Sequence, residues 1–304
     1  MVSQLAAEHV KVVLSGDGGD EIFAGYDKYV VEERERRYDR VPAPLRTMAG
    51  MVGAAMPYGM KGRGFLRHVA LDGPRRYLDA STLFRVDEMR SLFRPGAFAE
   101  VEHSAPWASS LASMRVEGMD WLSAVQYRDL NHYLPLDILT KVDRMTMAHS
   151  LEARPPLLDH KLVEFAATIP AHYRLRNGTT KYLFKQAMRG ILPNHIIDRP
   201  KHGFAVPLAR WFRKDLAEFA RDVLLSDSCR QRGVFDVRHV ERLLDLNDRG
   251  RDLDLQLWTV LSFELWCRRF LDAGDVSKTA PSRRTEVGRA PASPVIQGSL
   301  QASA

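Results

Sequence analysis

The chain has 304 residues, of which 45% are hydrophobic and 27% charged, and a net charge of +6. This is an ordinary globular composition, and the length allows one large domain or two smaller ones. No apolar run approaches the ~20 residues of a membrane-spanning helix, and the first residues lack a signal-peptide pattern. Cys229 and Cys267 are the only cysteines. We therefore expect no disulfide scaffold, no zinc site, no membrane span and a reducing, cytoplasmic location.

The positive charge leaves two classes of partner open. Basic residues are scattered among acidic ones, so an anionic small substrate such as a nucleotide explains the balance as well as nucleic acid does. An arginine-rich region over residues 34–76 keeps nucleic-acid binding as a minor alternative.

Residues 1–10 are expected to end a helix that runs into Val12–Leu14, whose short β-branched run predicts a buried strand. The loop Ser15–Asp20, SGDGGD, follows at once and contains three glycines, a hydroxyl and two carboxylates. From Glu21 onward the apolar spacing predicts one continuous helix through Val30. One such strand cannot form a sheet alone. We therefore interpret the chain as the C-terminal part of a larger α/β protein.

The geometry of strand, glycine loop and helix start presents free backbone N–H groups to an anion. Glycines allow a close approach, because no Cβ stands in the way. The two aspartates would repel a bare phosphate, but they suit a site in which Mg²⁺ lies between carboxylate and phosphate. A turn that merely caps a helix, with Asp or Ser as the cap, is the alternative at this point.

Further along, residues 42–75 are rich in Pro, Gly and Arg, and residues 76–118 contain short amphipathic segments. A long helix is predicted over 120–149, broken near Pro135 and ended by Pro155 and Pro156. Later helices are expected over 159–168, with Asp159 as the cap, and over 180–189, 208–225, 235–246 and 253–271. The last of these should lie in the core. Residues 273–304 lack a periodic apolar face and are predicted to be a disordered tail.

Two further stretches carry chemistry. In Tyr133–Asp159 many charges stand among apolar residues that look buried, which favours a structural ion-pair network in which Glu152 or Asp143 braces an arginine. Direct contact of Asp137 or Glu152 with a substrate is the alternative. In Asp198–Pro207, Lys201 follows a proline and is a candidate for neutralising charge on a phosphate, although a solvated loop lysine is the simpler interpretation.

Four stretches in order, SGDGGDEIFAGY, YLPLDILTKVDRMTMAHSLEARPPLLDH, KYLFKQAMRGILP and RPKHGFAVPLARWF, resemble the synthetase domain of glutamine-hydrolysing asparagine synthetases. Relatives of that family include amidotransferases of surface-polysaccharide systems and β-lactam-forming synthetases. The similarity covers roughly residues 5–272, so 1–272 is expected to be a partial synthetase domain.

The resemblance implies an adenine-nucleotide α-hydrolase-like fold, with a parallel sheet that is incomplete here and a large helical C-terminal portion. It also implies a reaction: ATP adenylates a carboxylate with release of pyrophosphate, and ammonia then displaces AMP to form an amide. Aspartate is the family's usual acceptor, and another carboxylate, on a sugar or a peptide, is the alternative. Ammonia comes from a glutaminase domain that this sequence lacks.

Site residues follow from the same resemblance. Leu14, Ser15 and Gly16 would contact ATP, and Asp20 would hold Mg²⁺. Asp17 stands where the family usually has a glutamate that takes a proton from the attacking amine. Lys201 matches the lysine that stabilises the adenylation transition state. Asp137 and Glu152 match acidic positions near the acyl pocket.

Two departures accompany the resemblance. The family's main pyrophosphate loop, SGGxDS, is absent from this sequence, and no cysteine precedes Cys229. We therefore expect the chain by itself neither to hydrolyse glutamine nor to bind ATP and Mg²⁺ well. A truncated, catalytically inactive relative that acts only as a binding module is the alternative function.

Overall fold

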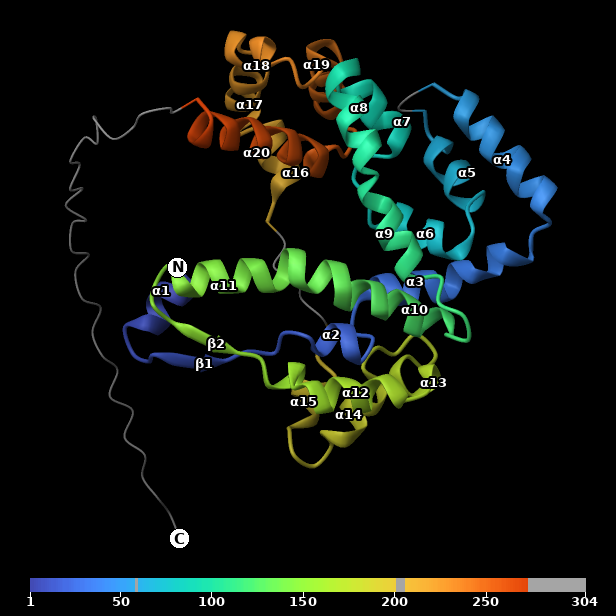
Figure 1. Ribbon diagram of the computed structural model, residues 1–304, viewed down its shortest axis with the longest axis vertical. Coiled ribbons are helices and arrows are strands. Elements are labelled where there is room, and N and C mark those ends of the chain that lie inside the picture. The colour runs from blue at the N-terminus through green and yellow to red at the C-terminus, as the bar shows by residue number, and fades with distance from the viewer. Residues whose placement is uncertain (58–59, 201–205, 273–304) are drawn as a thin grey trace.

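The computed structural model describes residues 1–57, 60–200 and 206–272, which form a mostly helical chain with one small parallel sheet at its edge (Figure 1). This confirms the predicted α/β class with a large helical portion. The predicted tail, 273–304, lies outside the described residues.

The sheet pairs two segments that are distant in the sequence. Strand β1 (Val12–Leu14) runs parallel to β2 (Glu152–Arg154), with Val12 opposite Glu152 and Leu14 opposite Arg154. Helix α1 (Val2–Ala7) precedes β1, as predicted. Strand β2 was not predicted, because its three residues, Glu-Ala-Arg, show no apolar pattern. Its extended conformation depends on hydrogen bonds to β1.

A long helical segment leads into β2. Helix α10 (Trp121–Arg128), a π-helical segment (Asp129–Leu139) and α11 (Thr140–Met147) follow one another without a break (Figure 1). The expected break at Pro135 is therefore wrong. The wider π turn accommodates a residue that has no N–H to donate, and Thr140 Oγ1 donates to the Pro135 carbonyl at 2.7 Å. The segment ends at Met147, before Pro155, because β2 intervenes.

Two predicted helices are divided. The helix expected from Glu21 to Val30 consists of α2 (Gly19–Ile22) and α3 (Asp27–Glu35), because Ala24 takes a φ of 56° and the Gly25 N–H returns to the Asp20 carbonyl at 2.8 Å. The helix expected over 208–225 consists of α16 (Leu208–Arg213) and α17 (Ala217–Leu224), separated where Lys214 leaves the helical region.

The other helices agree more closely with the local patterns. Asp159 caps α12 (His160–Thr168) by accepting the Lys161 N–H at 3.0 Å, as predicted. Helix α20 (Asp254–Phe270) buries one apolar face, as expected of a core helix. The remaining α-helices are α4 (Ala43–Ala55), α5 (Arg63–Val69), α6 (Gly73–Ala80), α7 (Val86–Leu92), α8 (Pro95–Ser104), α9 (Pro106–Ser113), α13 (Ala171–Arg174), α14 (Tyr182–Ala187), α15 (Asn194–Ile197), α18 (Asp227–Arg232) and α19 (Val237–Asp248).

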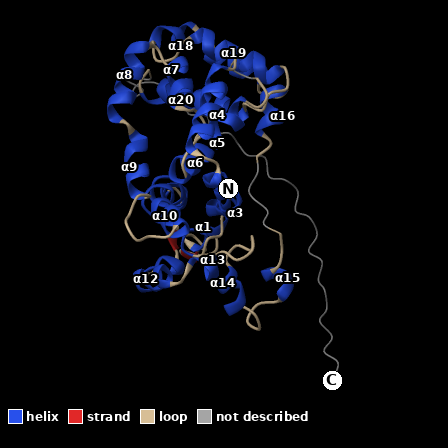
Figure 2. Cartoon of the chain, turned by 90° about the vertical axis from the view of Figure 1, so that its right-hand side faces the viewer, coloured by secondary structure: helices blue, strands red, loops and turns tan. Residues whose placement is uncertain are grey.

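Three apolar cores hold these helices together. One joins α7 to α16–α20 at one end of the molecule, while α12–α15 lie at the other end (Figure 2). A second core contains Ala24, Tyr29 and Tyr77, and a third contains Ile22 and Phe23. The five residues Ile22–Tyr26 thus contact two cores at once, which fixes the segment that follows the glycine loop. Within the described residues, no helix is long and apolar enough to cross a bilayer.

The charged stretch 133–159 is less buried than its sequence indicates. Met145 and Met147 are 56% and 60% exposed, whereas Leu151 is buried. Arg154 Nε lies 2.7 Å from Glu152 Oε1, so the predicted bracing of an arginine by Glu152 is confirmed, although both side chains are exposed. The premise that these charges are buried is therefore wrong.

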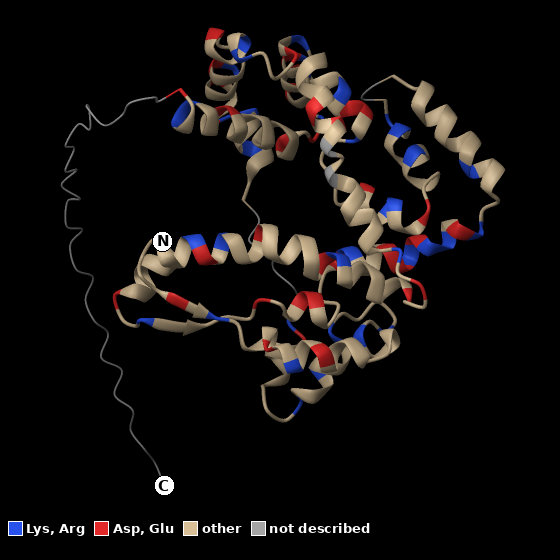
Figure 3. Ribbon diagram, in the orientation of Figure 1, with Lys and Arg blue, Asp and Glu red and all other residues tan. Residues whose placement is uncertain are grey.

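Acidic and basic residues are intermixed along α3 and α5–α7 (Figure 3). Arg63 and Arg67 pair with Asp87, and Arg76 pairs with Glu32. These arginines belong to the 34–76 region on which a nucleic-acid interface would depend, and they make internal ion pairs instead.

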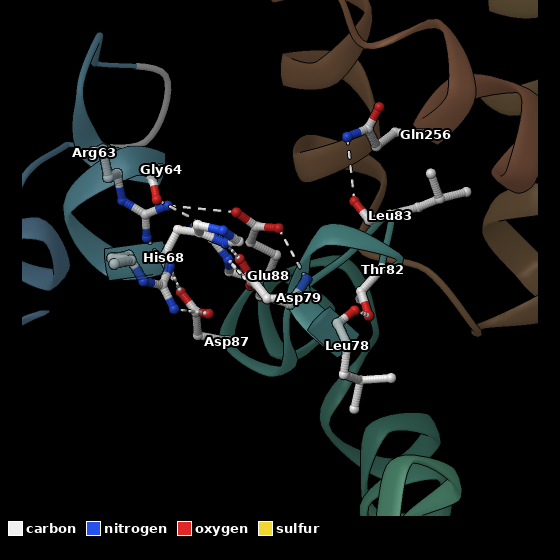
Figure 4. Close-up of polar contacts among 12 residues, drawn as sticks. Arg63, Gly64, His68, Leu78, Asp79, Thr82, Leu83, Asp87, Glu88 and Gln256 are labelled. Carbon is white, nitrogen blue, oxygen red and sulfur yellow. Dashed lines mark hydrogen bonds and ion pairs between the residues drawn. The ribbon is translucent and has the colours of Figure 1, made fainter. Parts of the chain in front are cut away.

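One histidine links three helices in this part of the molecule. His68 of α5 lies between two carboxylates, with Nδ1 2.7 Å from Asp79 Oδ2 and Nε2 2.9 Å from Glu35 Oε2. Asp79 also binds Arg85 through both carboxylate oxygens (Figure 4). The hydrogen bond to Asp79, opposed by burial and assisted by Glu35, raises the pKa of His68 above its usual 6.5.

We expect His68→Gln to lower the free energy of unfolding by about 1–2 kcal/mol at pH 6, the low end of the range for charged hydrogen bonds because solvent reaches the site. A raised folded-state pKa gives stability that is complete below the unfolded-state value of about 6.5 and is lost as pH rises through the folded-state value. Urea unfolding of both proteins at pH 6 and pH 9 should show the difference shrinking at the higher pH. The exposed His103→Gln serves as control, and a pH-independent difference would contradict the prediction.

Candidate functional site

The glycine loop lies against the segment that follows β2. Gly18 takes a φ of 86° at the start of α2, a conformation that favours glycine. A Cβ added at Gly18 would lie 2.1 Å from Leu158 Cδ2, and one added at Gly19 would lie 2.8 Å from Leu157 Cδ1. Gly18 is therefore required both by its φ and by its contact with Leu158, whereas a Cβ at Gly19 would need only the Leu157 methyl group to shift.

The first residues of the loop continue the sheet. Leu14 ends β1 with 74% of its surface exposed, and the Ser15 N–H donates to the Arg154 carbonyl at 3.0 Å. Ser15 Oγ donates to Asp17 Oδ2 at 2.8 Å, so this serine orients the carboxylate. Gly16 is exposed, and a Cβ added there would meet nothing within 4 Å. Of the three predicted ATP contacts, Gly16 has the most open backbone.

A lysine from a distant segment of the chain forms an ion pair with the last residue of the loop. Lys181 Nζ lies 3.0 Å from Asp20 Oδ1, and both side chains keep more than a quarter of their surface exposed. Lys181 precedes α14 with a φ of 53°, which directs the residue from the helix start toward α2. The sequence analysis did not select Lys181, although it opens the KYLFKQA stretch. Only the packing of α14 against α2, seen in the stacked rings of Phe23 and Phe184, brings it to Asp20.

Gly25 leaves room for this ion pair because it has no side chain. A Cβ added at Gly25 would lie 2.0 Å from Asp20 Oδ1, 2.2 Å from Lys181 Cε and 2.9 Å from the Asp20 Cα. Part of this overlap involves backbone, which cannot rotate away. The glycine is thus required by the close approach of α2 to Lys181.

Next to the loop, a network of buried hydrogen bonds fixes the position of α2. Glu21 is 1% exposed, and Tyr26 Oη donates to its Oε1 at 2.6 Å. Burial raises the pKa of Glu21, and the Tyr26 bond opposes the rise. Gln126 Nε2 donates to the Glu21 carbonyl, while Arg174 Nη1 donates to Gln126 Oε1 at 2.6 Å. The residue next to Asp20 is therefore fixed by side chain and backbone together.

A second buried group anchors α3. Asp129 is fully buried and accepts hydrogen bonds from Tyr29 at 2.7 Å and Tyr77 at 2.6 Å. Lys28 Nζ lies 2.9 Å from the same carboxylate and 4.2 Å from the ring centroid of Tyr133. Burial lowers the pKa of Lys28, and Asp129 counteracts the shift.

The remaining predicted residues do not gather at Asp20 in the described contacts. Asp137 is half-exposed on the π-helical segment, 3.8 Å from Lys141 Nζ, and Glu152 pairs with Arg154 on β2. Lys201 lies outside the described residues.

The arrangement suits a divalent cation shared with a phosphate rather than a cation enclosed by protein. Within the described ranges, no group of three or more His, Cys, Asp or Glu residues could hold a metal ion. Mg²⁺ often takes only one or two carboxylates together with waters and substrate phosphates, and Asp20 with its accessible carboxylate fits that role. Lys181 adds a positive charge that favours an anion beside it.

We expect Gly25→Ala to lower the free energy of unfolding by about 1–3 kcal/mol, the usual cost of forcing extra volume into a packed site. Urea unfolding measures this directly. Gly16→Ala in the preceding glycine loop is the matched control, and it should change stability by less than about 0.5 kcal/mol because its Cβ meets open space. Equal effects of the two variants would contradict the packing argument.

Comparison with known proteins identifies the family. The profile of the family described as Asparagine synthase matches residues 1–268. The chain is 37% identical over 273 residues to a putative glutamine-hydrolyzing asparagine synthetase of Mycobacterium tuberculosis, an alignment that covers 89% of this chain and 41% of the relative. It is 33% identical over 270 residues to glutamine-hydrolyzing asparagine synthetase 1 of Bacillus subtilis, covering 87% of this chain and 41% of that protein.

The chain thus spans about two fifths of the length of the curated relatives it matches. The match runs through both strands, the glycine loop and the helical portion up to the last described helix. The chain belongs to the asparagine synthase family.

Proposed function

We propose that this chain forms part of the ATP-binding site of an amide-forming ligase of the asparagine synthase type. In the reaction, a carboxylate attacks the α-phosphorus of ATP and pyrophosphate leaves. Ammonia then attacks the acyl-adenylate and AMP leaves, so that an amide remains. The family membership supports this reaction class, and the site around Asp20 supports its assignment to these residues.

The observation that carries the proposal is the pairing of Asp20 with Lys181 at the end of β1. A carboxylate oxygen suits a hard cation, and an ammonium beside it suits phosphate oxygens. Glycines on both sides keep this pair accessible and close to the backbone. A turn that only capped a helix would need none of these features.

Individual roles follow. Asp20 would hold Mg²⁺, which when bound neutralises charge on the phosphates. Leu14, Ser15 and Gly16 would contact ATP. Because the Ser15 N–H already donates to Arg154, this contact would depend mainly on Gly16 and on the Ser15 carbonyl. Lys201 would stabilise the transition state of adenylation.

Asp17 would accept the proton from the attacking amine. Ser15 Oγ holds its carboxylate in place, which gives a fixed acceptor at the loop. Asp137 and Glu152 would border the acyl pocket, and their exposure leaves them accessible to a substrate. Aspartate or another carboxylate is the proposed acceptor, and ammonia, supplied by a glutaminase domain, is the proposed nucleophile.

Exposed apolar side chains support association with further polypeptide, and they also favour the second candidate function, a binding module without catalysis. They include Leu14 of β1, Leu136 of the π-helical segment, and Met145 and Met147 of α11, each more than half exposed. Such exposure on a sheet and a neighbouring helix marks an interaction surface. We propose that a segment carrying the SGGxDS loop covers it in the active enzyme.

We expect the chain alone to show negligible ATP–pyrophosphate exchange and to gain it when combined with a polypeptide that carries SGGxDS and a glutaminase domain. Radiolabelled pyrophosphate incorporation into ATP is the measurement. Strong exchange by the chain alone would contradict the role given to the second segment. Stable association without exchange would favour the binding-module alternative.

In the combined enzyme, Asp20→Asn should lower AMP release by at least about 100-fold, because loss of a metal-binding carboxylate weakens stabilisation of the phosphates. Asp27→Asn on the exposed start of α3 is the matched control, with the same charge change and no expected loss. Raising Mg²⁺ should restore part of the Asp20→Asn activity. Equal activity of the two variants would remove Asp20 from the site.

Asp17→Asn should separate the two steps. Adenylation needs no proton acceptor for the amine, so pyrophosphate exchange should persist, while amide formation should fall by about 10²–10⁴-fold. Parallel measurement of exchange and of amide product tests this. A proportional loss of both would assign Asp17 to ATP binding instead.

A further inference from the structure

We propose that the cavity between α5, α6, α7 and α9 binds an amphipathic anion, a small molecule with one carboxylate or phosphate group on an apolar body. The cavity has a volume of about 410 Å³, within the range of small-molecule sites. None of its lining residues belongs to the glycine loop, so the proposal does not depend on the function argued above.

One wall of the cavity is apolar. Two aromatic side chains and five aliphatic or thioether side chains line it, from α6, α7, α9 and the connections between them: Leu71, Leu78, Phe84, Val86, Met89, Trp107 and Leu111. An apolar ligand group that packs on this wall is removed from water, which makes the free energy of binding more favourable.

Charged residues make up much of the remaining lining, here called the charged wall, and their carboxylates are already occupied by arginine or histidine donors. Asp79 binds Arg85 through both oxygens, at 2.5 and 2.7 Å, and its Oδ2 also contacts His68 (Figure 4). Burial would raise the pKa of Asp79, but hydrogen bonds from His68 and Arg85 lower it to about 2. Asp87 binds Arg67 through both oxygens, at 2.5 and 2.8 Å. Neither carboxylate is left to attract a cation.

Donors on the same wall exceed the acceptors. Arg67, Arg75 and Arg85 line the cavity, and each guanidinium has five N–H donors against the two carboxylates. Arg75 makes its described ion pair, with Asp72, at 3.8 Å, and its side chain is 56% exposed. The lining thus has three positive and two negative charges, and Arg75 is the guanidinium best able to turn toward an added anion.

The cavity also lies next to a contact between α20 and the segment that connects α6 to α7. The Leu83 carbonyl, next to the lining residues Thr82 and Phe84, accepts a hydrogen bond from Gln256 Nε2 of α20 at 3.2 Å (Figure 4). A ligand packed on Phe84 would therefore stabilise the segment that connects α6 to α7 and α20. Binding should raise the thermal unfolding midpoint of the whole chain.

Three probes of equal length and different charge test the proposal: octanoate, octanol and octylammonium. Isothermal titration of the full chain should show octanoate binding at least tenfold tighter than octanol, with octylammonium weakest. Arg75→Ala should reduce the preference for octanoate over octanol by about tenfold. Arg90→Ala, an exposed arginine of α7 outside the cavity, should leave it unchanged.

A variant that fills the cavity tests the location. Leu111→Trp should abolish octanoate binding without touching the charged wall, and Val86→Phe provides the same test from α7 if the first variant is unstable. Equal affinity for octanoate and octanol, no saturable octanoate binding at millimolar concentration, or unchanged binding by a folded cavity-filling variant would each overturn the proposal.

Discussion

The buried carboxylate of Asp129 is the group on which the site's architecture depends. It is fully buried, and it is compensated by Lys28, Arg128 and the hydroxyls of Tyr29 and Tyr77. Removing one partner of a buried charge pair typically costs about 3–5 kcal/mol, because the remaining charge loses its compensation. These contacts tie α3 and α6 to the start of the π-helical segment. They also fix the direction of α3 after the turn formed by residues 23–26 between α2 and α3, here called the α2 corner.

The α2 corner transmits this constraint to the glycine loop. Ile22 and Phe23 pack into one core and Ala24 into another, while Gln126 holds the Glu21 carbonyl. Asp20 is therefore placed by neighbours that have no role in binding a ligand. Its partner Lys181 belongs to a distant segment of the chain and directly precedes α14. The ion pair adds a polar contact where α14 already packs against the end of α2 through Phe184 and Phe23.

Local patterns identified the elements whose conformation depends on near neighbours. Strand β1, the Asp159 cap of α12 and the buried face of α20 were all predicted from residue type and spacing. The predicted burial of β1 is wrong, because Val12 and Leu14 are exposed. Residues that depend on distant partners were not predicted. Nothing in Glu-Ala-Arg indicates β2 without β1 beside it, and Lys181 reaches Asp20 only through α14. Pro135 predicts a break by the ordinary rule for α-helices, and the π-helical geometry, which that rule does not include, explains why none occurs.

The two-stranded sheet is the least well-packed element next to the candidate site. Isolated two-stranded sheets are marginally stable in water, and three-residue strands make few ladder bonds. Here the loop that follows the sheet carries the candidate proton acceptor Asp17 and leads to the candidate metal ligand Asp20 in α2, yet Leu14 remains largely exposed. The helical cores are rigid and well buried, whereas the strand that presents the loop has little packing of its own. A surface that covered Leu14 and Met147 would stabilise the strand and, through it, the loop. Association with further polypeptide would then couple directly to the geometry at Asp20.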